Sequence, residues 1–466
     1  MSQRPSPDNH FLTAPLGKVF ATTAIPMAVV MTMNGLLGII DAAFLGHFVG
    51  ADAITAVGIS FPVLMLAIAL STLVSGGMSS MFARQLGRGA RADAAATFAS
   101  AHGLALVLGL VLALLFLLGG SAFARHMAGA DPVVADMVWQ FLMISLAGSP
   151  VQFVLALHAD AWRNEGRAGS MALLSLGVTA LNILLNYMLI VLCGLGVAGS
   201  AGSTVLAQII GLALLLEGRR RSSTLLPLSS LWQHGWFGNW RQFVALGAPV
   251  SLSFIGMAFT ATCVLAVLSQ QSQIQHSEIQ QGQAQLHTMA AYGVITRILG
   301  FAFLPMMALG LSMQSIAGNN AGAGFYHRAR RVAAISASTA LVYGAVVELV
   351  LLRQSHAVAS IFMTDMQVIA EVSRIVRPMM ALYLLSGPVF MLGLYCQAIG
   401  QPARAGLLTL TKSFILLPGL IIALALLTTA NSIWFAYPAA EAIVTAIAIW
   451  LLAKTDKRAS RLGAVS

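Results

Sequence analysis

Asp41 is the residue with the clearest potential for chemistry, because it follows the apolar run MAVVMTMNGLLGII. An ionisable side chain inside a bilayer costs about 2.5 to 3.5 kcal/mol on insertion scales, so such a residue needs a reason to be there. Poor hydration disfavours the charged form of a carboxylate, which could then load and release a proton or hold a cation. The alternative is an interfacial aspartate that caps the next turn.

Other polar side chains also fall in apolar segments. Asn182 and Asn186 are four residues apart and therefore share one face of a helix, where they could bind an ion or join helices by hydrogen bonds. Glu441 lies deep in the last apolar run and is either functional or paired with a base such as Arg297. Lys412, near the start of its run, is expected to extend toward the membrane surface.

The elements that carry these residues are predicted to be membrane-spanning helices. The chain has 466 residues, of which 58% are hydrophobic and 9% charged, against roughly 25% charged residues in soluble domains. A spanning helix needs about 20 mostly apolar residues, since the hydrocarbon core satisfies no backbone hydrogen bonds. Twelve such runs occur, at 18–45, 53–76, 96–119, 137–162, 170–194, 198–218, 243–268, 286–317, 332–352, 375–399, 406–428 and 432–453.

The basic residues predict how the helices are oriented. The net charge of +10 could suggest a nucleic-acid partner, but Lys and Arg concentrate before the first run and after every second one, for example at Arg84, Arg163, Arg219 and Lys454. By the positive-inside rule both termini are cytoplasmic, which an even number of spans requires. The polar start of the chain lacks the pattern of a secretory signal, so we expect the first helix to remain.

An internal repeat organises the chain into two halves. At a constant offset of 235, Met78-x-Ser80 matches Met313-x-Ser315, and Gly87-x-Gly89 matches Gly322-x-Gly324. Six helices therefore repeat as six, and both copies start from the cytoplasm, as in parallel repeats that can enclose a cavity. We predict a cytoplasmic tail at 1–17, an N-lobe at 18–218, a linker at 219–242, a C-lobe at 243–453 with a Gln-rich extracytoplasmic insertion at 269–286, and a tail at 454–466.

Several motifs resemble one transporter family in order and along nearly the whole chain. They include IIDAAFLGHFVGADAITAVGIS (39–60), ARQLGRGARADA (83–94), WRNEGRAG (162–169), LNILLNY (181–187), GVAGSAGSTVLAQ (196–208), AGNNAGAG (317–324) and YCQAIGQPARAG (395–406). Together they resemble the MATE (multidrug and toxic compound extrusion) transporters of bacteria. The resemblance implies an all-α membrane protein with two six-helix repeats around a central cleft, which expels organic, often cationic or amphipathic, compounds in exchange for protons or sodium.

The resemblance also implies roles for particular residues. Asp41, Asn182, Asn186 and Thr204 match the ion-coupling constellation, although several relatives have an aspartate where this chain has Asn186. An amide cannot exchange a proton near neutral pH, so Asp41 would lack a second carboxylate. Pro26 would allow the first helix to bend on protonation of Asp41, with a static kink as the alternative. The residues expected to line the substrate cavity are Met31, Asn34, Gln152, Met257, Tyr292, Gln397 and Glu441.

The remaining expectations concern partners and rival functions. Walker, CxxCH, HExxH and Gly-x-Ser-x-Gly motifs are absent from the sequence, and the three cysteines are widely separated, so we expect no cofactor, no metal site and no enzyme activity. The coupling ion is expected to be H⁺, with Na⁺ as the alternative. We expect a monomer in the bacterial inner membrane that carries small organic compounds and binds no nucleic acid. The rival functions are a flippase or exporter of a lipid-linked or metabolite substrate and, less favoured, a membrane-embedded enzyme.

Overall fold

The chain is an all-α integral membrane protein with twelve transmembrane helices. The computed structural model describes residues 9–129, 131–221, 226–274, 279–427 and 430–463, and no strand occurs in those residues. Ten of their helices are long and apolar enough to cross a membrane, and two bent helix pairs, each counted as one span, bring the number to twelve. All twelve predicted runs therefore correspond to spans.

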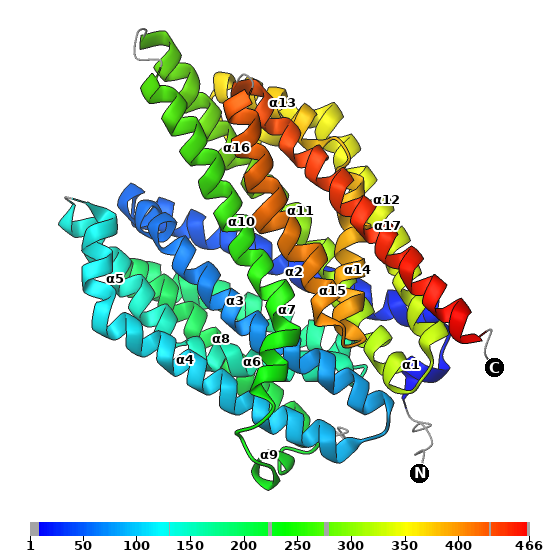
Figure 1. Cartoon of the computed structure of the whole chain (residues 1–466). Coiled ribbons are helices and arrows are strands. Elements are labelled where there is room, and N and C mark those ends of the chain that lie inside the picture. Colours follow the sequence, from blue (N-terminus) through cyan, green and yellow to red (C-terminus); the bar gives the residue numbers. More distant parts are fainter. Residues whose placement is uncertain (1–8, 130, 222–225, 275–278, 428–429, 464–466) are drawn as a thin grey trace. The chain divides into compact units, whose positions relative to one another are not determined.

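The first six spans run from α2 to α8 (Figure 1). Within them α4 packs against α5, α2 against α7, and α7 against α8, while α6 packs against both α3 and α4. Apolar side chains from α3 to α6 form one core around Phe82, Phe98 and Phe153. The bounds in the first half are α1 His10–Thr13, α2 Leu16–Phe48, α3 Ala51–Gly87, α4 Arg91–Ala128, α5 Pro132–Ala147, α6 Ser149–Asn164, α7 Ala168–Asn186, the π-helix η1 Tyr187–Leu192, α8 Gly196–Arg221 and α9 Ser230–Gln233.

The second six spans run from α10 to α17 (Figure 1). A second apolar core surrounds Tyr292 and Trp434. The bounds are α10 Trp240–Ile274, α11 Ile279–Gly322, α12 Tyr326–Ser360, α13 Met366–Met380, the 3₁₀-helix η2 Tyr383–Leu385, α14 Ser386–Ala398, α15 Pro402–Leu410, the π-helix η3 Thr411–Leu416, α16 Leu417–Leu427, the 3₁₀-helix η4 Ala430–Phe435 and α17 Ala436–Gly463. Helical backbone covers 269–274 and 279–286 of the predicted insertion, and 275–278 lie outside the described residues.

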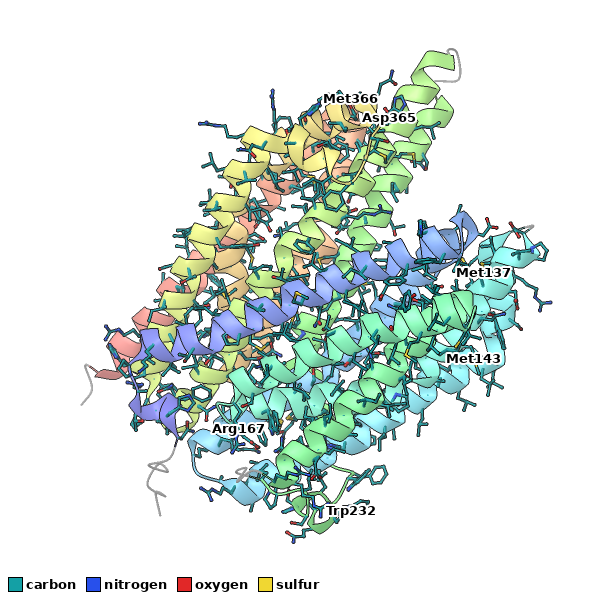
Figure 2. The ribbon with its side chains drawn as sticks, turned by 180° about the vertical axis from the view of Figure 1, so that it is seen from behind. Met137, Met143, Arg167, Trp232, Asp365 and Met366 are labelled. Carbon is teal, nitrogen blue, oxygen red and sulfur yellow. The ribbon has the colours of Figure 1, made fainter. Side chains whose placement is uncertain are left out.

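Two spans that were predicted as single helices are broken. The fourth bends by 44° between α5 and α6, where Gly148 precedes Ser149 and Pro150. The tenth bends by 55° between α13 and η2–α14, after Pro378, and it begins at Met366, nine residues earlier than the predicted 375. Proline cannot donate a backbone hydrogen bond, which explains why the breaks lie next to prolines. Figure 2 shows Asp365 at the start of α13, where its side chain accepts a hydrogen bond of 2.8 Å from the Gln367 backbone N–H.

The helices form two compact units. Unit 1 contains Met1–Phe254, Met307–Val332 and Gln397–Pro402, and unit 2 contains Ile255–Met306, Ala333–Cys396 and Ala403–Ser466. The chain passes from one unit to the other inside α10, shortly after Pro249, and inside α11, directly after Pro305. Unit 1 therefore includes segments of the second half of the sequence. The lobe boundaries that the repeat predicts remain a prediction.

The repeat is visible as a reciprocal contact inside unit 1. A Cβ added to Gly87 would lie 1.9 Å from the backbone oxygen of Asn319, and one added to Gly322 would lie 2.0 Å from that of Arg84. Arg84 and Asn319 are themselves related by the offset of 235 that relates the two glycines. Helices of a membrane protein approach this closely only at small residues. The sequence repeat thus marks a pseudo-symmetric crossing of α3 and α11.

We expect Gly87→Val and Gly322→Val each to destabilise the folded protein by about 1–3 kcal/mol, because the added side chain must push two helix backbones apart. Thermal unfolding in detergent measures the effect. Gly177→Val is the matched control, since no atom lies within 4 Å of a Cβ at that helical glycine. Equal unfolding midpoints for all three variants would contradict the close crossing.

Candidate functional site

Asp41 lies on α2, which packs against α7 in unit 1. The side chain is partly buried, and its Oδ1 accepts a hydrogen bond of 2.5 Å from the Asn186 side-chain N–H. No ion pair of the described residues includes Asp41. The carboxylate therefore faces a neutral amide and has no cationic side chain to neutralise it.

Asn186 is the centre of a hydrogen-bonded group that we call the amide network, made of Asp41, Asn182, Asn186, Ser203 and Thr204. The Asn186 amide nitrogen donates to Asp41 Oδ1 and also to Asn182 Oδ1, 3.2 Å away. Its oxygen accepts a hydrogen bond from the Ser203 hydroxyl. Asn182 in turn donates to Thr204 Oγ1 at 3.2 Å. Three of the four hydrogen bonds that an amide can make are thus used at Asn186.

Local structure explains how this network is held. Asn182 and Asn186 lie on consecutive turns of α7 and are both buried, as is Ser203 of α8. Immediately after Asn186 the helix widens into η1, and π-helical turns of this kind occur frequently at functional sites. The Ser203 hydroxyl lies 2.8 Å from the Ser200 backbone oxygen and shares its single proton between that oxygen and Asn186, and Thr204 donates to the same backbone oxygen at 3.2 Å. The side chains around Asp41 are thereby pre-positioned.

The network has the chemistry of a single ionisable site. Among its five side chains only Asp41 can gain or lose a proton near neutral pH. The two N–H bonds of Asn186 are both donated to oxygen atoms, so its amide is oriented to stabilise a charged Asp41 carboxylate. Asp41 can thus alternate between a hydrogen-bonded anion and a neutral acid, or hold one monovalent cation.

Comparisons with known proteins place the chain among transporters. The sequence profile described as MatE matches residues 26–188 and 282–422, which is more than half of the chain. The chain belongs to the MatE family. The FAD transporter of Shewanella oneidensis is 24% identical to it over 424 residues, covering 88% of each protein. The multidrug export protein MepA of Staphylococcus haemolyticus is 22% identical over 435 residues, covering 91% of each.

Solved structures share the fold of this MatE protein. An outward-facing multidrug resistance MATE family transporter of the MOP superfamily matches with a TM-score of 0.85 at 21% identity, over 98% of this chain and 99% of the other. A MOP superfamily transporter from Pyrococcus furiosus matches with a TM-score of 0.84 at 21% identity, over 96% and 97%. The family resemblance seen in the motifs is confirmed, and with it the architecture of two six-helix repeats.

The structure brings the four predicted ion-coupling residues of this MatE protein together and adds Ser203. Sequence reasoning missed Ser203 because Thr204 alone completed the constellation that the family resemblance suggested. The available signal was the pair of adjacent hydroxyl residues Ser203 and Thr204 in the segment SAGST, inside the predicted run 198–218. The ion-coupling role itself stays a prediction.

The residues predicted to line the substrate cavity divide between the two units. Tyr292 is buried, and its hydroxyl lies 3.0 Å from that of Tyr437. Met257 is 47% exposed, whereas Gln397 is buried. Their role in binding stays a prediction. Unit 1 holds Met31, Asn34, Gln152 and Gln397, and unit 2 holds Met257, Tyr292 and Glu441.

Glu441 has a partner that the sequence did not predict. Its carboxylate accepts a hydrogen bond from the Lys412 ammonium, not from Arg297, which is exposed. The expectation that Lys412 extends toward the membrane surface is therefore wrong. The physical reason is that a lysine within reach of a buried carboxylate gains more from the ion pair than from a distant headgroup region.

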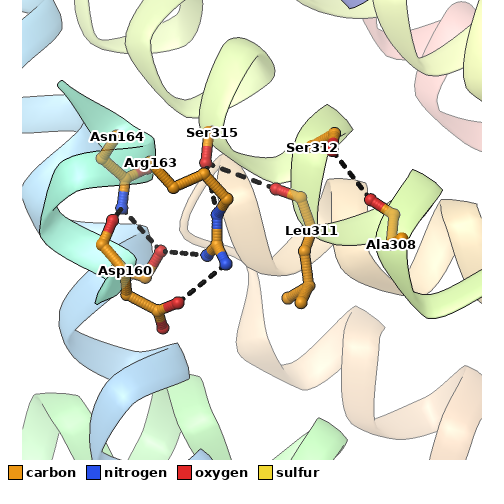
Figure 3. Close-up of polar contacts among 8 residues, drawn as sticks. Asp160, Arg163, Asn164, Ala308, Leu311, Ser312 and Ser315 are labelled. Atoms are coloured by element: carbon orange, nitrogen blue, oxygen red, sulfur yellow. Dashed lines mark hydrogen bonds and ion pairs between the residues drawn. The ribbon is translucent and has the colours of Figure 1, made fainter. Parts of the chain in front are cut away.

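Two arginines expected in cytoplasmic loops are instead buried in helices of unit 1. Arg163, in the last turn of α6, forms an ion pair of 2.7 Å with Asp160 and donates to Ser315 of α11 at 3.0 Å (Figure 3). It also donates to Ser79 of α3 at 3.1 Å. Arg219 of α8 is paired with Glu165 at 2.7 Å. Arg167, which Figure 2 shows in the turn between α6 and α7, lies in a loop as expected. The sequence alone does not distinguish an arginine in a loop from an arginine buried in an ion pair.

We expect Ser203→Ala to destabilise the protein by about 1–3 kcal/mol, because the buried Asn186 oxygen would lose its donor. Thermal unfolding in detergent reports the loss. Ser269→Ala removes an exposed hydroxyl that donates to the Ala266 backbone oxygen, and it serves as the control with an expected change near zero. A Ser203→Ala variant as stable as Ser269→Ala would show that the Asn186 oxygen does not need this hydroxyl.

Proposed function

We propose that this MatE protein is a secondary active antiporter that exports small organic compounds, cationic or amphipathic, in exchange for protons. The observation that carries the proposal is the partly buried Asp41 carboxylate, which is hydrogen-bonded to Asn186 and belongs to no ion pair of the described residues. The names of the MepA relatives support multidrug export. Antiport requires that proton uptake and substrate occupancy oppose each other, which an acid that alternates between two charge states provides.

The amide network favours H⁺ over Na⁺ as the coupling ion. Sodium needs several oxygen ligands, and the candidates besides Asp41 are the side-chain oxygens of Asn182, Asn186 and Thr204. Each of these oxygens already accepts a hydrogen bond inside the network. Sodium would have to gather the remaining lone pairs of several of these oxygens around itself, whereas a proton needs only the Asp41 carboxylate. Protonation would also weaken the bond to Asn186, and Pro26 on the same helix would allow α2 to bend in response.

The cellular setting belongs to the same proposal. The chain is a multi-pass membrane protein, and the distribution of Lys and Arg supports cytoplasmic termini in a bacterial inner membrane. We infer a monomer that acts as a carrier, without enzyme activity and without a nucleic-acid partner. The predicted bending of α2 and the predicted substrate cavity between two lobes would together allow alternating access.

A second candidate function is the export of an anionic metabolite. The observation in its favour is the FAD transporter of Shewanella oneidensis, whose similarity to this chain covers 88% of both proteins. Efflux assays with both ethidium and flavin nucleotides would separate the two functions.

Asp41→Asn is expected to abolish gradient-driven efflux while the protein remains folded, because the amide preserves size and hydrogen bonding but cannot take up a proton. Ethidium efflux from energised right-side-out vesicles measures transport, and thermal unfolding checks the fold. Asp52→Asn, at an exposed position of α3, is the matched control and should transport like the wild type. Wild-type efflux by Asp41→Asn would rule out Asp41 as the coupling residue. Imposed pH and sodium gradients in proteoliposomes then identify the ion.

A further inference from the structure

The segment 226–239, which we call the linker segment, leads into α10 and is packed onto α4 within unit 1. Its short helix α9 packs against α4, and Leu231 of α9 is buried in the apolar core of α3 to α6. The Ser100 hydroxyl of α4 donates to the Gly238 backbone oxygen. The Trp240 indole N–H donates back to the Ser100 backbone oxygen at 3.1 Å. These contacts fix where along α4 the linker segment lies.

The depth of the linker segment follows from the part of α4 that it touches. The apolar run predicted in α4 begins at 96, so Ser100 lies about 6 Å and Gly103 about 10 Å inside it, at about 1.5 Å per residue. Gly103 is in contact as well, because a Cβ added there would overlap the Trp236 backbone oxygen. The linker segment is therefore level with one end of the apolar run, at the depth where the hydrocarbon core meets the lipid headgroups.

The three tryptophans of this region have different surroundings. Trp236 and Trp240 each donate the indole N–H to a backbone oxygen of the protein, at 2.9 and 3.1 Å. Trp232 is 81% exposed, and no described residue accepts a hydrogen bond from its indole N–H. Figure 2 shows Trp232 at the outer edge of unit 1. Its N–H is thus available to an acceptor outside the protein.

Phe237 adds a second exposed aromatic ring to the linker segment. It is 78% exposed, and the centre of its ring lies 5.4 Å from that of Trp240. The Trp232 ring is likewise 5.6 Å from that of Trp236. Each exposed ring therefore rests on a ring that the protein holds by a hydrogen bond. Tryptophan is enriched at the interfaces of a membrane, where its apolar ring and its polar N–H both find partners.

Arginines flank the linker segment on both sides. Arg220 and Arg221 end α8, Arg241 lies in the first turn of α10, and all three are exposed. Glu217 compensates part of this charge, since its carboxylate lies 2.6 Å from Arg221 and 3.8 Å from Arg220. Three positive charges against one negative charge leave the flanks of the linker segment positive. Guanidinium groups bind phosphate oxygens through paired hydrogen bonds.

We propose that the linker segment is a membrane-interface anchor that binds an anionic phospholipid of the cytoplasmic leaflet. Trp232 and Phe237 enter the boundary between acyl chains and headgroups, and the flanking arginines pair with the phosphate and the negative headgroup. The occupant is a lipid and not a soluble partner, because the linker segment lies level with the apolar run of α4. The bias of Lys and Arg predicts the cytoplasmic leaflet. The proposal does not depend on which compound the protein transports.

Quenching by brominated lipid tests the position of Trp232. The full-length protein is reconstituted into phosphatidylcholine bilayers with or without bromine on the acyl chains near the glycerol, and tryptophan emission is compared. Trp232→Phe should reduce the emission that bromine quenches. Trp434→Phe, at a buried position, is the control and should remove only emission that bromine does not quench. Quenching of Trp232 by aqueous iodide and not by brominated lipid would place it in water, open to a soluble partner, and would overturn the anchor.

The lipid preference is measured on the Trp232 signal, which is the difference in emission between the wild type and Trp232→Phe. We expect brominated phosphatidylglycerol to quench this signal at lower mole fractions than brominated phosphatidylcholine. Arg241→Gln should reduce the preference about fivefold, as expected for one basic residue at an anionic surface. Arg125→Gln is the matched control, because Arg125 is exposed in the last turn of α4, and it should leave the preference unchanged.

Thermal unfolding checks that the variants are folded, and Arg220→Gln provides the same test if Arg241→Gln is not. Equal quenching of the Trp232 signal by the two lipids would overturn the anionic-lipid site. A preference that falls equally in Arg241→Gln and Arg125→Gln would overturn it too, since the attraction would then come from the net charge of the whole protein.

Discussion

The hydrocarbon core of a membrane offers no partner to a charge or a hydrogen-bonding group. Polar groups in the interior of this protein must therefore find their partners within the protein itself. Backbone groups are satisfied inside helices, which accounts for an all-helical architecture. Polar side chains occur where they can satisfy one another, as in the amide network around Asn186. Asp41 is the ionisable member of that network, and it is the residue at which we propose that a proton is exchanged.

Asp41 and Glu441 each place a carboxylate in a membrane-spanning helix, and the groups that contact the two carboxylates differ. Asp41 is surrounded by neutral amides and hydroxyls, so its charge can be removed by a proton without leaving an opposite charge behind. Glu441 is paired with Lys412, so an ammonium compensates the charge of its carboxylate. A π-helical segment directly follows Asn186 in the first site, and another contains Lys412 in the second; in both, the widened turn shifts side chains from their usual register. The two halves of the repeat thus share a helix arrangement, whereas the side chains that contact the two carboxylates differ.

Glycine residues allow close helix packing, and proline residues allow helices to change direction. The reciprocal contacts of Gly87 and Gly322 bring α3 and α11 together in unit 1, and the Arg163 cross-link lies between the same elements and α6. Pro249 and Pro305 stand close to the points where α10 and α11 pass between units. A proline removes one hydrogen bond of a helix, so these are the positions at which a long helix can change direction at least cost.

The number of spans, the repeat, the family and four members of the amide network could be predicted from the amino-acid sequence, because hydropathy, charge bias and motif order do not depend on contacts between distant residues. Which polar groups meet became known from the folded structure. Ser203 joined the network, Lys412 replaced Arg297 as the partner of Glu441, and Arg163 and Arg219 moved from predicted loops into buried ion pairs. The bends at Gly148 and Leu382 were likewise invisible in composition. Pairing depends on distance and direction between helices far apart in sequence, and a one-dimensional pattern does not contain either.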